Sequence, residues 1–178
     1  MREGLTRRGP DTFPLAPKML YLDQEIGVLL MAPVPTPSPH EILEDLAAEF
    51  DMLGDWEERY RHIIDLGRSL PPLTDTEHSD ANKVRGCSSQ VWIVSQTAPD
   101  GTLTLRGDSD AHIVRGLVAL VLQLYSGQTP GAILGLDPHE AFARLGLSTA
   151  LSSQRANGLK SMVERIRQDA HAAVARHD

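Results

Sequence analysis

Apolar side chains recur at helical spacing near the start of the patterned part of this chain. The stretch opens with a serine N-cap at Ser38, proline at the first helical position, Pro39, and a capping-box acid, Glu41. Its apolar positions are Ile42, Leu43, Leu46 and Phe50. The pattern predicts an amphipathic helix that Gly54 ends.

A second amphipathic helix is predicted from Asp55 to the proline pair at residues 71–72. Asp55 and Glu58 have the spacing of another capping box, and the prolines cannot continue a helix. The residues predicted to be buried on this helix are Trp56, Tyr60, Ile63, Ile64 and Leu66. Because the break between the two helices is short, we expect them to pack as a hairpin.

The spacing changes to that of β-strands after a polar segment. Residues 83–84 are predicted to open a short strand that breaks at Gly86. Residues 91–94 are β-branched or aromatic, and residues 102–105 alternate between polar and apolar, on either side of a Pro-Asp-Gly turn. The pattern predicts a small antiparallel sheet.

The helical period returns after Gly107, with an N-cap at Ser109 or Asp108. A helix that is apolar nearly all round is a buried one, so we place this helix across the sheet at the centre of the core. Gly127 ends it. Its apolar positions are Ile113, Val114, Leu117, Val118, Leu120, Val121, Leu122 and Leu124.

Two short helices and one long helix are predicted in the C-terminal part. Thr129-Pro130 and Asp137-Pro138 have the form of helix starts. The long final helix has one apolar face, made of Leu159, Met162, Val163, Ile166 and Ala170. Together the patterns predict one α+β domain over residues 39–178.

Residues 1–38 are predicted to be an N-terminal extension that ends in a proline-rich linker, PVPTPSP. The extension has early arginines, but its apolar run at residues 26–32 is short and follows acidic residues, unlike a secretory signal. We therefore expect a soluble extension, with Met19 and Met31 as alternative translation starts.

Composition narrows the class of protein further. The 178 residues are 41% hydrophobic and 23% charged, as in soluble globular proteins, and no run approaches the length of a membrane span. A formal net charge of -7 disfavours nonspecific binding to nucleic acid. A single cysteine excludes a disulfide framework and fits a reducing compartment, so we expect a cytoplasmic protein.

That single cysteine, Cys87, is the main candidate for chemistry. Lone cysteines are most often small buried hydrophobic residues. Here Gly86 precedes it and Ser88 and Ser89 follow, which favours a turn that presents the sulfur outside the sheet. Two nearby cations, at positions 83 and 85, would favour the thiolate, and backbone N–H groups of residues 86–89 would form an anion-binding nest.

The segment GCSSQVW resembles the active-site loop of the SufE family of sulfur-acceptor proteins, in which GCQSQVW is a common form. Three other segments resemble the family in the same order: WEERYRHIIDLGRSLPPL, GDSDAHIVRGLVALVLQLYSGQTP and LSSQRANGLKSM. The resemblance covers roughly residues 39–170. The departures are Ser88, where glutamine is frequent, and Arg85, where histidine is frequent; they put specificity in doubt more than chemistry.

The resemblance implies a small antiparallel sheet packed against helices, similar to the scaffold protein IscU. It implies that Cys87 accepts sulfur from a pyridoxal-phosphate cysteine desulfurase of the SufS type, carries it as a persulfide and delivers it to a SufBCD-type scaffold. The pyridoxal phosphate belongs to the desulfurase, so no cofactor is expected here. The family also implies a resting cysteine loop tucked against an apolar cavity, and a monomer or weak homodimer.

The same resemblance gives further residues a place near the loop. Asp110 matches a family position that influences the mobility of the loop, although a helix N-terminus would also favour an acid there. Arg155 matches a family arginine near the loop, although it also suits a surface helix. Gln90 is expected to fix the loop by hydrogen bonds, Trp92 to pack in the core, and Gly86 to shape the backbone.

Other functions remain open from the residues alone. One is a stand-alone thiol enzyme, such as a single-cysteine peroxidase, and another is a noncovalent adaptor whose cysteine is structural. A metal site has little support, because the seven histidines are scattered and no Cys-x-x-Cys pair exists. Phosphate-binding motifs are also absent.

Overall fold

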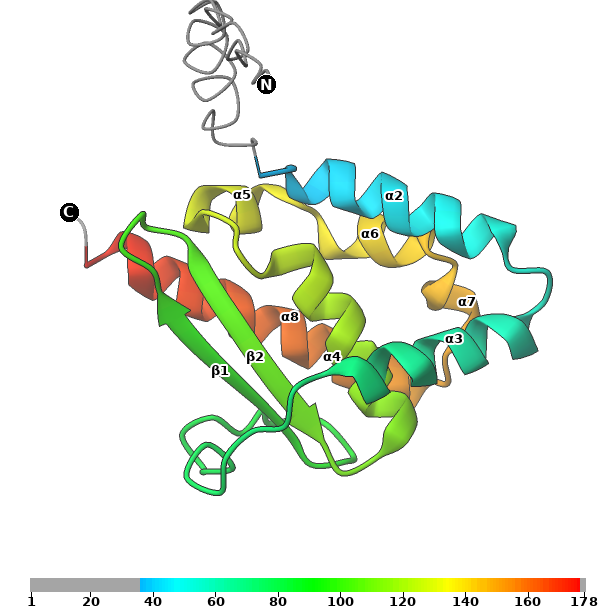
Figure 1. Ribbon diagram of the computed structural model, residues 1–178, viewed down its shortest axis with the longest axis horizontal. Helices are drawn as coiled ribbons and strands as arrows, with labels where there is room; N and C mark the ends of the chain where they lie inside the picture. Colours follow the sequence, from blue (N-terminus) through cyan, green and yellow to red (C-terminus); the bar gives the residue numbers. More distant parts are fainter. Residues whose placement is uncertain (1–35, 177–178) are drawn as a thin grey trace, which may run out of the picture. The chain divides into compact units, whose positions relative to one another are not determined.

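The computed structural model describes residues 36–176; the predicted extension before residue 36, with its alternative starts, lies outside them. The fold class is α+β, as predicted: seven helices and one two-stranded antiparallel sheet form the described residues (Figure 1). In chain order they are α2 (Pro39–Met52), α3 (Trp56–Ser69), β1 (Val91–Thr97), β2 (Leu103–Ser109), α4 (His112–Tyr125), α5 (Pro130–Gly135), α6 (Pro138–Arg144), α7 (Leu147–Ala150) and α8 (Ser153–Val174). None of these helices is both long and apolar enough to cross a bilayer.

Helix α4 forms the centre of the core, and this prediction is confirmed. It packs against α3, β2 and α8, so apolar neighbours surround it (Figure 1). Ten of its 14 residues are buried, which explains why the sequence shows almost no polar face. The burial of this helix therefore ties the sheet to the rest of the domain.

Both strands are longer than the sequence predicts. Strand β1 pairs with β2 from Val91 opposite Ser109 to Thr97 opposite Leu103. Gly107 thus lies within β2, where Val118 of α4 packs closely over the position that a side chain would occupy. Gly107 is a glycine because α4 packs closely on the strand at this position, and it does not mark the end of the strand.

The predicted cap of α4 is wrong. The N-cap is Ala111, which makes no side-chain cap bond, and Ser109 is the last residue of β2. The Ser109 hydroxyl donates a hydrogen bond to the carbonyl of Gln90, and Asp108 pairs with His78 and Arg115. These polar side chains therefore bond to distant segments of the chain and do not cap α4.

The capping box of α2 is confirmed, whereas that of α3 is only half right. Asp55 accepts from the Glu58 N–H at 3.0 Å, but the Glu58 carboxylate accepts from Gly54 instead of from the N-cap backbone. Fewer residues of α3 are buried than the sequence predicts. Ile63 is fully buried, whereas Trp56 is exposed.

Helices α2 and α3 do not pack along each other as the predicted hairpin would. They meet at His62, whose ring contacts Phe50 edge-on at 5.6 Å between centroids and lies 3.3 Å from the Glu49 carboxylate, while α3 packs along α4.

A contact between two glycines lets the backbones of α3 and α4 approach closely. A Cβ atom on Gly67 would lie 2.6 Å from the backbone nitrogen of Gly116, and one on Gly116 would lie 2.1 Å from the carbonyl oxygen of Ile63. No side chain fits at this crossing.

The C-terminal helices follow the predictions closely. The short helices α5 and α6 begin where the Thr-Pro and Asp-Pro pairs place them, while the four-residue α7 was not predicted. The apolar face predicted for the final helix is buried on α8, together with Gly158 and Ala173. Helix α8 packs against α4, α5 and β1, so one of its faces runs beside the start of the sheet (Figure 1).

Candidate functional site

Cys87 lies on a loop that leaves and rejoins the sheet. The predicted strand at Lys83 is reduced to a single bridge opposite Trp92, after which the chain turns and returns at Val91. Gly86 has a φ of +93°, a conformation that favours glycine, and a Cβ atom there would lie 2.7 Å from the Ser161 hydroxyl of α8. This turn, the "thiol loop" (residues 83–90), is therefore shaped to press against α8.

The Cys87 thiol faces the N-terminal part of α8. It is half-buried, and its sulfur donates a weak hydrogen bond to the carbonyl of Gly158 at 3.5 Å. A Cβ atom at Gly158 would lie 3.6 Å from the sulfur, an ordinary van der Waals distance, so the thiol packs directly on the backbone of α8 here. The cavity left beside the thiol measures only about 10 Å³.

Burial raises the pKa of the Cys87 thiol, since the thiolate loses hydration at this position. The expectation that Lys83 and Arg85 favour the thiolate is therefore wrong for the loop in this position. Lys83 donates to the side-chain oxygen of Gln90 at 3.1 Å, and the exposed Arg85 lies outside the thiol cavity. In this position the loop therefore favours the protonated thiol over the thiolate.

The raised pKa predicts a shift in the reactivity of Cys87. Only the thiolate is alkylated at an appreciable rate, and its fraction at a given pH falls as the pKa rises. We expect the alkylation rate of the folded protein to increase with pH at higher values than that of the same chain unfolded in urea. Iodoacetamide kinetics measured from pH 7 to 10 test this; coincident profiles, or a folded profile at lower pH, would contradict it.

Asp110 and Gln90 hold the C-terminal end of the thiol loop. The Asp110 carboxylate accepts from the Gln90 N–H at 3.0 Å, and the Asp110 N–H donates back to the Gln90 carbonyl at 3.3 Å. The hydroxyl of Ser109 donates to the same carbonyl at 2.8 Å. Asp110 precedes α4, so its contacts are with the loop and it does not cap the helix.

Removing this anchor should expose the thiol. The Asp110→Ala variant loses an exposed, charge-assisted hydrogen bond of about 1 kcal/mol, so we expect Cys87 to be alkylated about fivefold faster at fixed pH. Asp45→Ala, which removes an exposed acid from α2, is the matched control and should leave the rate unchanged. Equal rates in wild type and Asp110→Ala would show that Asp110 does not restrain the loop.

Ser88, Ser89 and Arg155 line the thiol cavity together with Cys87. The Arg155 guanidinium lies over the ring of Tyr60 on α3, 5.7 Å from its centroid. This cation–π contact fixes the arginine beside the loop. The structure therefore brings together the cysteine, both serines and the arginine, while Gln90 and Asp110 form the anchor. Arg85 lines a different hollow, together with Lys83.

The family resemblance implied an apolar cavity beside the loop, but the sequence did not reveal the helix carbonyl that meets the thiol. Gly158 is separated from Cys87 by 71 positions, and a glycine inside a predicted helix was the only local signal for it. Trp92, expected in the core, is only half-buried and makes an edge contact with His78 at 4.6 Å between ring centroids. The remaining wall residues are Val114, Leu117, Gln154 and Met162.

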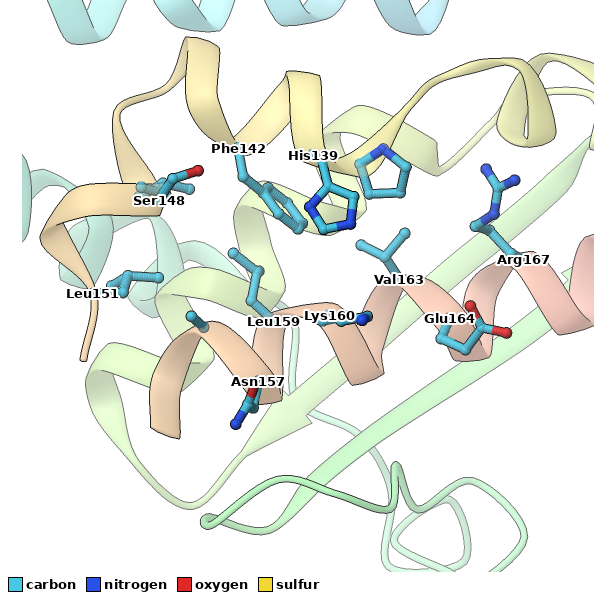
Figure 2. A pocket seen from close by; sticks show the side chains of 13 residues that line it. His139, Phe142, Ser148, Leu151, Asn157, Leu159, Lys160, Val163, Glu164 and Arg167 are labelled. Carbon is cyan, nitrogen blue, oxygen red and sulfur yellow. The ribbon is translucent and has the colours of Figure 1, made fainter. Parts of the chain in front are cut away.

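A larger apolar pocket of about 510 Å³ does not include the thiol. It lies between α6, α7 and α8, with Phe142 and Val163 among its apolar residues and His139 and Lys160 among its polar ones (Figure 2). Its volume would suit a small-molecule ligand, but no nucleophile of this pocket is comparable with Cys87. Within residues 36–176, no three His, Cys, Asp or Glu side chains are grouped as metal ligands.

The fold and the site together define a small α+β protein that holds one protonated thiol on a restrained loop against a helix. Residues 44–170 match the SufE family, described as an Fe-S metabolism associated domain. The chain therefore belongs to the SufE family of iron–sulfur metabolism.

Individual relatives agree with this assignment. The chain is 50% identical over 136 residues to an uncharacterized SufE-like protein of Rhizobium etli, covering 75% of this chain and 92% of the relative. It is 47% identical over 135 residues to an uncharacterized SufE-like protein of Rhizobium meliloti, covering 74% and 96%. The solution structure of a hypothetical protein from Thermus thermophilus has a similar fold, with a TM-score of 0.64 at 19% identity over 79% of this chain and 99% of that one.

Proposed function

We propose that this protein accepts sulfur on Cys87 from a pyridoxal-phosphate cysteine desulfurase of the SufS type and carries it as a persulfide to an iron–sulfur cluster scaffold of the SufBCD type. The observation that carries the proposal is the single thiol on a restrained loop in a chain that belongs to the SufE family. The protein acts as a carrier and activator, and the desulfurase is the enzyme.

The transfer is an exchange between sulfur atoms without net oxidation. The Cys87 thiolate attacks the outer sulfur of the desulfurase persulfide, the S–S bond of the donor breaks, and the donor cysteine leaves as a thiolate. A proton from Cys87 is given up when the nucleophile forms and is available to the leaving thiolate. The absence of a second cysteine in the chain suits a carrier, because no neighbouring thiol can release the cargo as sulfide.

The closed loop protects the thiol but does not accommodate the product. A site needs about 10 to 15 Å³ of such cavity volume to hold even one water molecule, and the space beside Cys87 is about 10 Å³. Because the space beside the thiol is this small, we expect the loop to move away from Gly158 when the persulfide forms. Leaving the helix also rehydrates the thiol, which lowers its pKa and supplies the thiolate that the reaction needs.

Two features favour the carrier over a stand-alone thiol peroxidase. A peroxidase must hold a reactive thiolate without a partner, whereas burial raises the pKa of Cys87. Peroxidases of this kind have a thioredoxin-like fold with parallel strands, and residues 36–176 contain only an antiparallel pair.

The adaptor alternative has one observation in its favour. Cys87 packs against the hydrophobic core, as a structural cysteine would. The two functions differ in whether sulfur becomes bound to the protein. Incubation with a desulfurase and cysteine, followed by intact-protein mass spectrometry, distinguishes them: the carrier gains sulfur at Cys87, and the adaptor does not.

A further inference from the structure

A second hollow lies directly beside the thiol loop. It has a volume of about 530 Å³, and the loop forms one wall of it while α8 forms the other. We call it the basic groove; its charged residues are Lys83, Arg85, Lys160, Arg165, Asp80 and Glu164. The contact of Gly86 with Ser161 joins the two walls, and Ser161 itself lines the groove.

The charge of the groove is opposite to that of the whole chain. Four cations and two carboxylates surround it, although the chain carries a formal net charge of -7. Arg165 is engaged by Asp169 at 3.2 Å, and Lys83 by the neutral Gln90. Arg85 and Lys160 have no ion-pair partner within the described part of the chain, so at least two cations are available to a ligand.

These cations have no function within the resting site. Arg85 is two positions from Cys87 but lines the groove instead of the thiol cavity, and Lys160 lies on α8 outside the loop. Neither of them holds the loop closed by a hydrogen bond to another described residue. Two uncommitted cations on an acidic protein, next to its only thiol, are best explained by a ligand of negative charge.

We propose that the basic groove docks an acidic surface segment of the sulfur-donating desulfurase. This inference rests on the proposed function, because the donor must be a protein that brings its persulfide to Cys87. A polypeptide carboxylate lying along the groove would contact Arg85 on the loop and Lys160 on α8 at once. A nucleic acid fits less well, since the remaining surface of this acidic chain would repel it.

The test compares charge reversals on the two walls of the groove. Arg85→Glu and Lys160→Glu are each expected to weaken binding to the pyridoxal-phosphate form of a SufS-type desulfurase by about tenfold. The dissociation constant of the wild type should rise with salt, and this dependence should be smaller in both variants. The matched control is Arg61→Glu, which reverses a 65% exposed arginine on α3 and should change binding less than twofold, roughly the size of a surface contact.

Each outcome separates the docking inference from the proposed function. If both groove variants bind the desulfurase as tightly as the wild type does, and the wild type accepts sulfur, docking in the basic groove is wrong while the carrier function stands. If only Lys160→Glu weakens binding, the contact lies in the pocket of Figure 2, which Lys160 also lines, and docking in the basic groove is again wrong. An unchanged alkylation rate of Cys87 in Lys160→Glu shows that the loop is intact. A wild type that accepts no sulfur is evidence against the proposed function itself.

Discussion

Replacing Cys87 with serine is expected to abolish sulfur acceptance and to leave the fold intact. A hydroxyl cannot attack a persulfide near neutral pH, so the stimulation of the desulfurase should fall to the rate of the desulfurase alone. The thiol is half-buried, and its polar contact is one weak hydrogen bond of 3.5 Å to the carbonyl of Gly158. The free energy of unfolding should therefore change by less than about 1 kcal/mol.

The measurement for this variant is alanine production by the desulfurase, alone and with each form of the protein. The control is Thr104→Ser, a comparable change at an exposed residue of β2, which should stimulate like the wild type. Urea unfolding of each variant shows whether a loss of stimulation reflects chemistry or stability. Stimulation by a folded Cys87→Ser protein would favour the adaptor function.

The second large effect is on stability, at the crossing of α3 and α4. Gly116→Ala places a methyl group against the carbonyl of Ile63, at a position only 2.1 Å from the oxygen, so the two helices must separate. Because backbone atoms block the space, relaxation is costly, and we expect a loss of about 3 kcal/mol or more. For a domain of this size, that loss lowers the melting temperature by roughly 10 °C.

Gly131→Ala is the matched control for Gly116→Ala. It makes the same substitution within a helix, but a Cβ atom at Gly131 meets no atom within 4 Å. Alanine is favoured over glycine in helices by up to about 1 kcal/mol, so this variant should be no less stable than the wild type. Thermal unfolding of both proteins checks the prediction. A melting temperature of Gly116→Ala within a few degrees of the wild type would show that the crossing adapts easily.

The elements of this fold could be predicted because their signals are local. Proline and capping residues mark the starts of α2, α5 and α6, and the apolar run of α4 requires a buried helix. The failures occur where a residue with a local meaning serves a distant contact. Ser109 resembles a helix cap but bonds to the thiol loop, and Gly107 resembles a strand end but makes room for α4.

The site divides in the same way. Cys87 and the turn at Gly86 were visible because they are adjacent in sequence, and the family resemblance placed Asp110 and Arg155 near them. The pKa of the thiol could not be predicted, because it depends on burial against Gly158, which only the packing of α8 determines. The two nearby cations suggested a lowered pKa for Cys87. In the structure Arg85 lines the basic groove, and desolvation of the thiolate raises the pKa instead.

The most direct test of the account is the mass of the intact protein after incubation with a SufS-type desulfurase, pyridoxal phosphate and cysteine. We expect the wild type to gain the mass of one or more sulfur atoms, which a reductant removes, and the Cys87→Ser variant to gain none. No gain in a folded wild-type protein whose thiol can be alkylated would contradict sulfur transfer to Cys87.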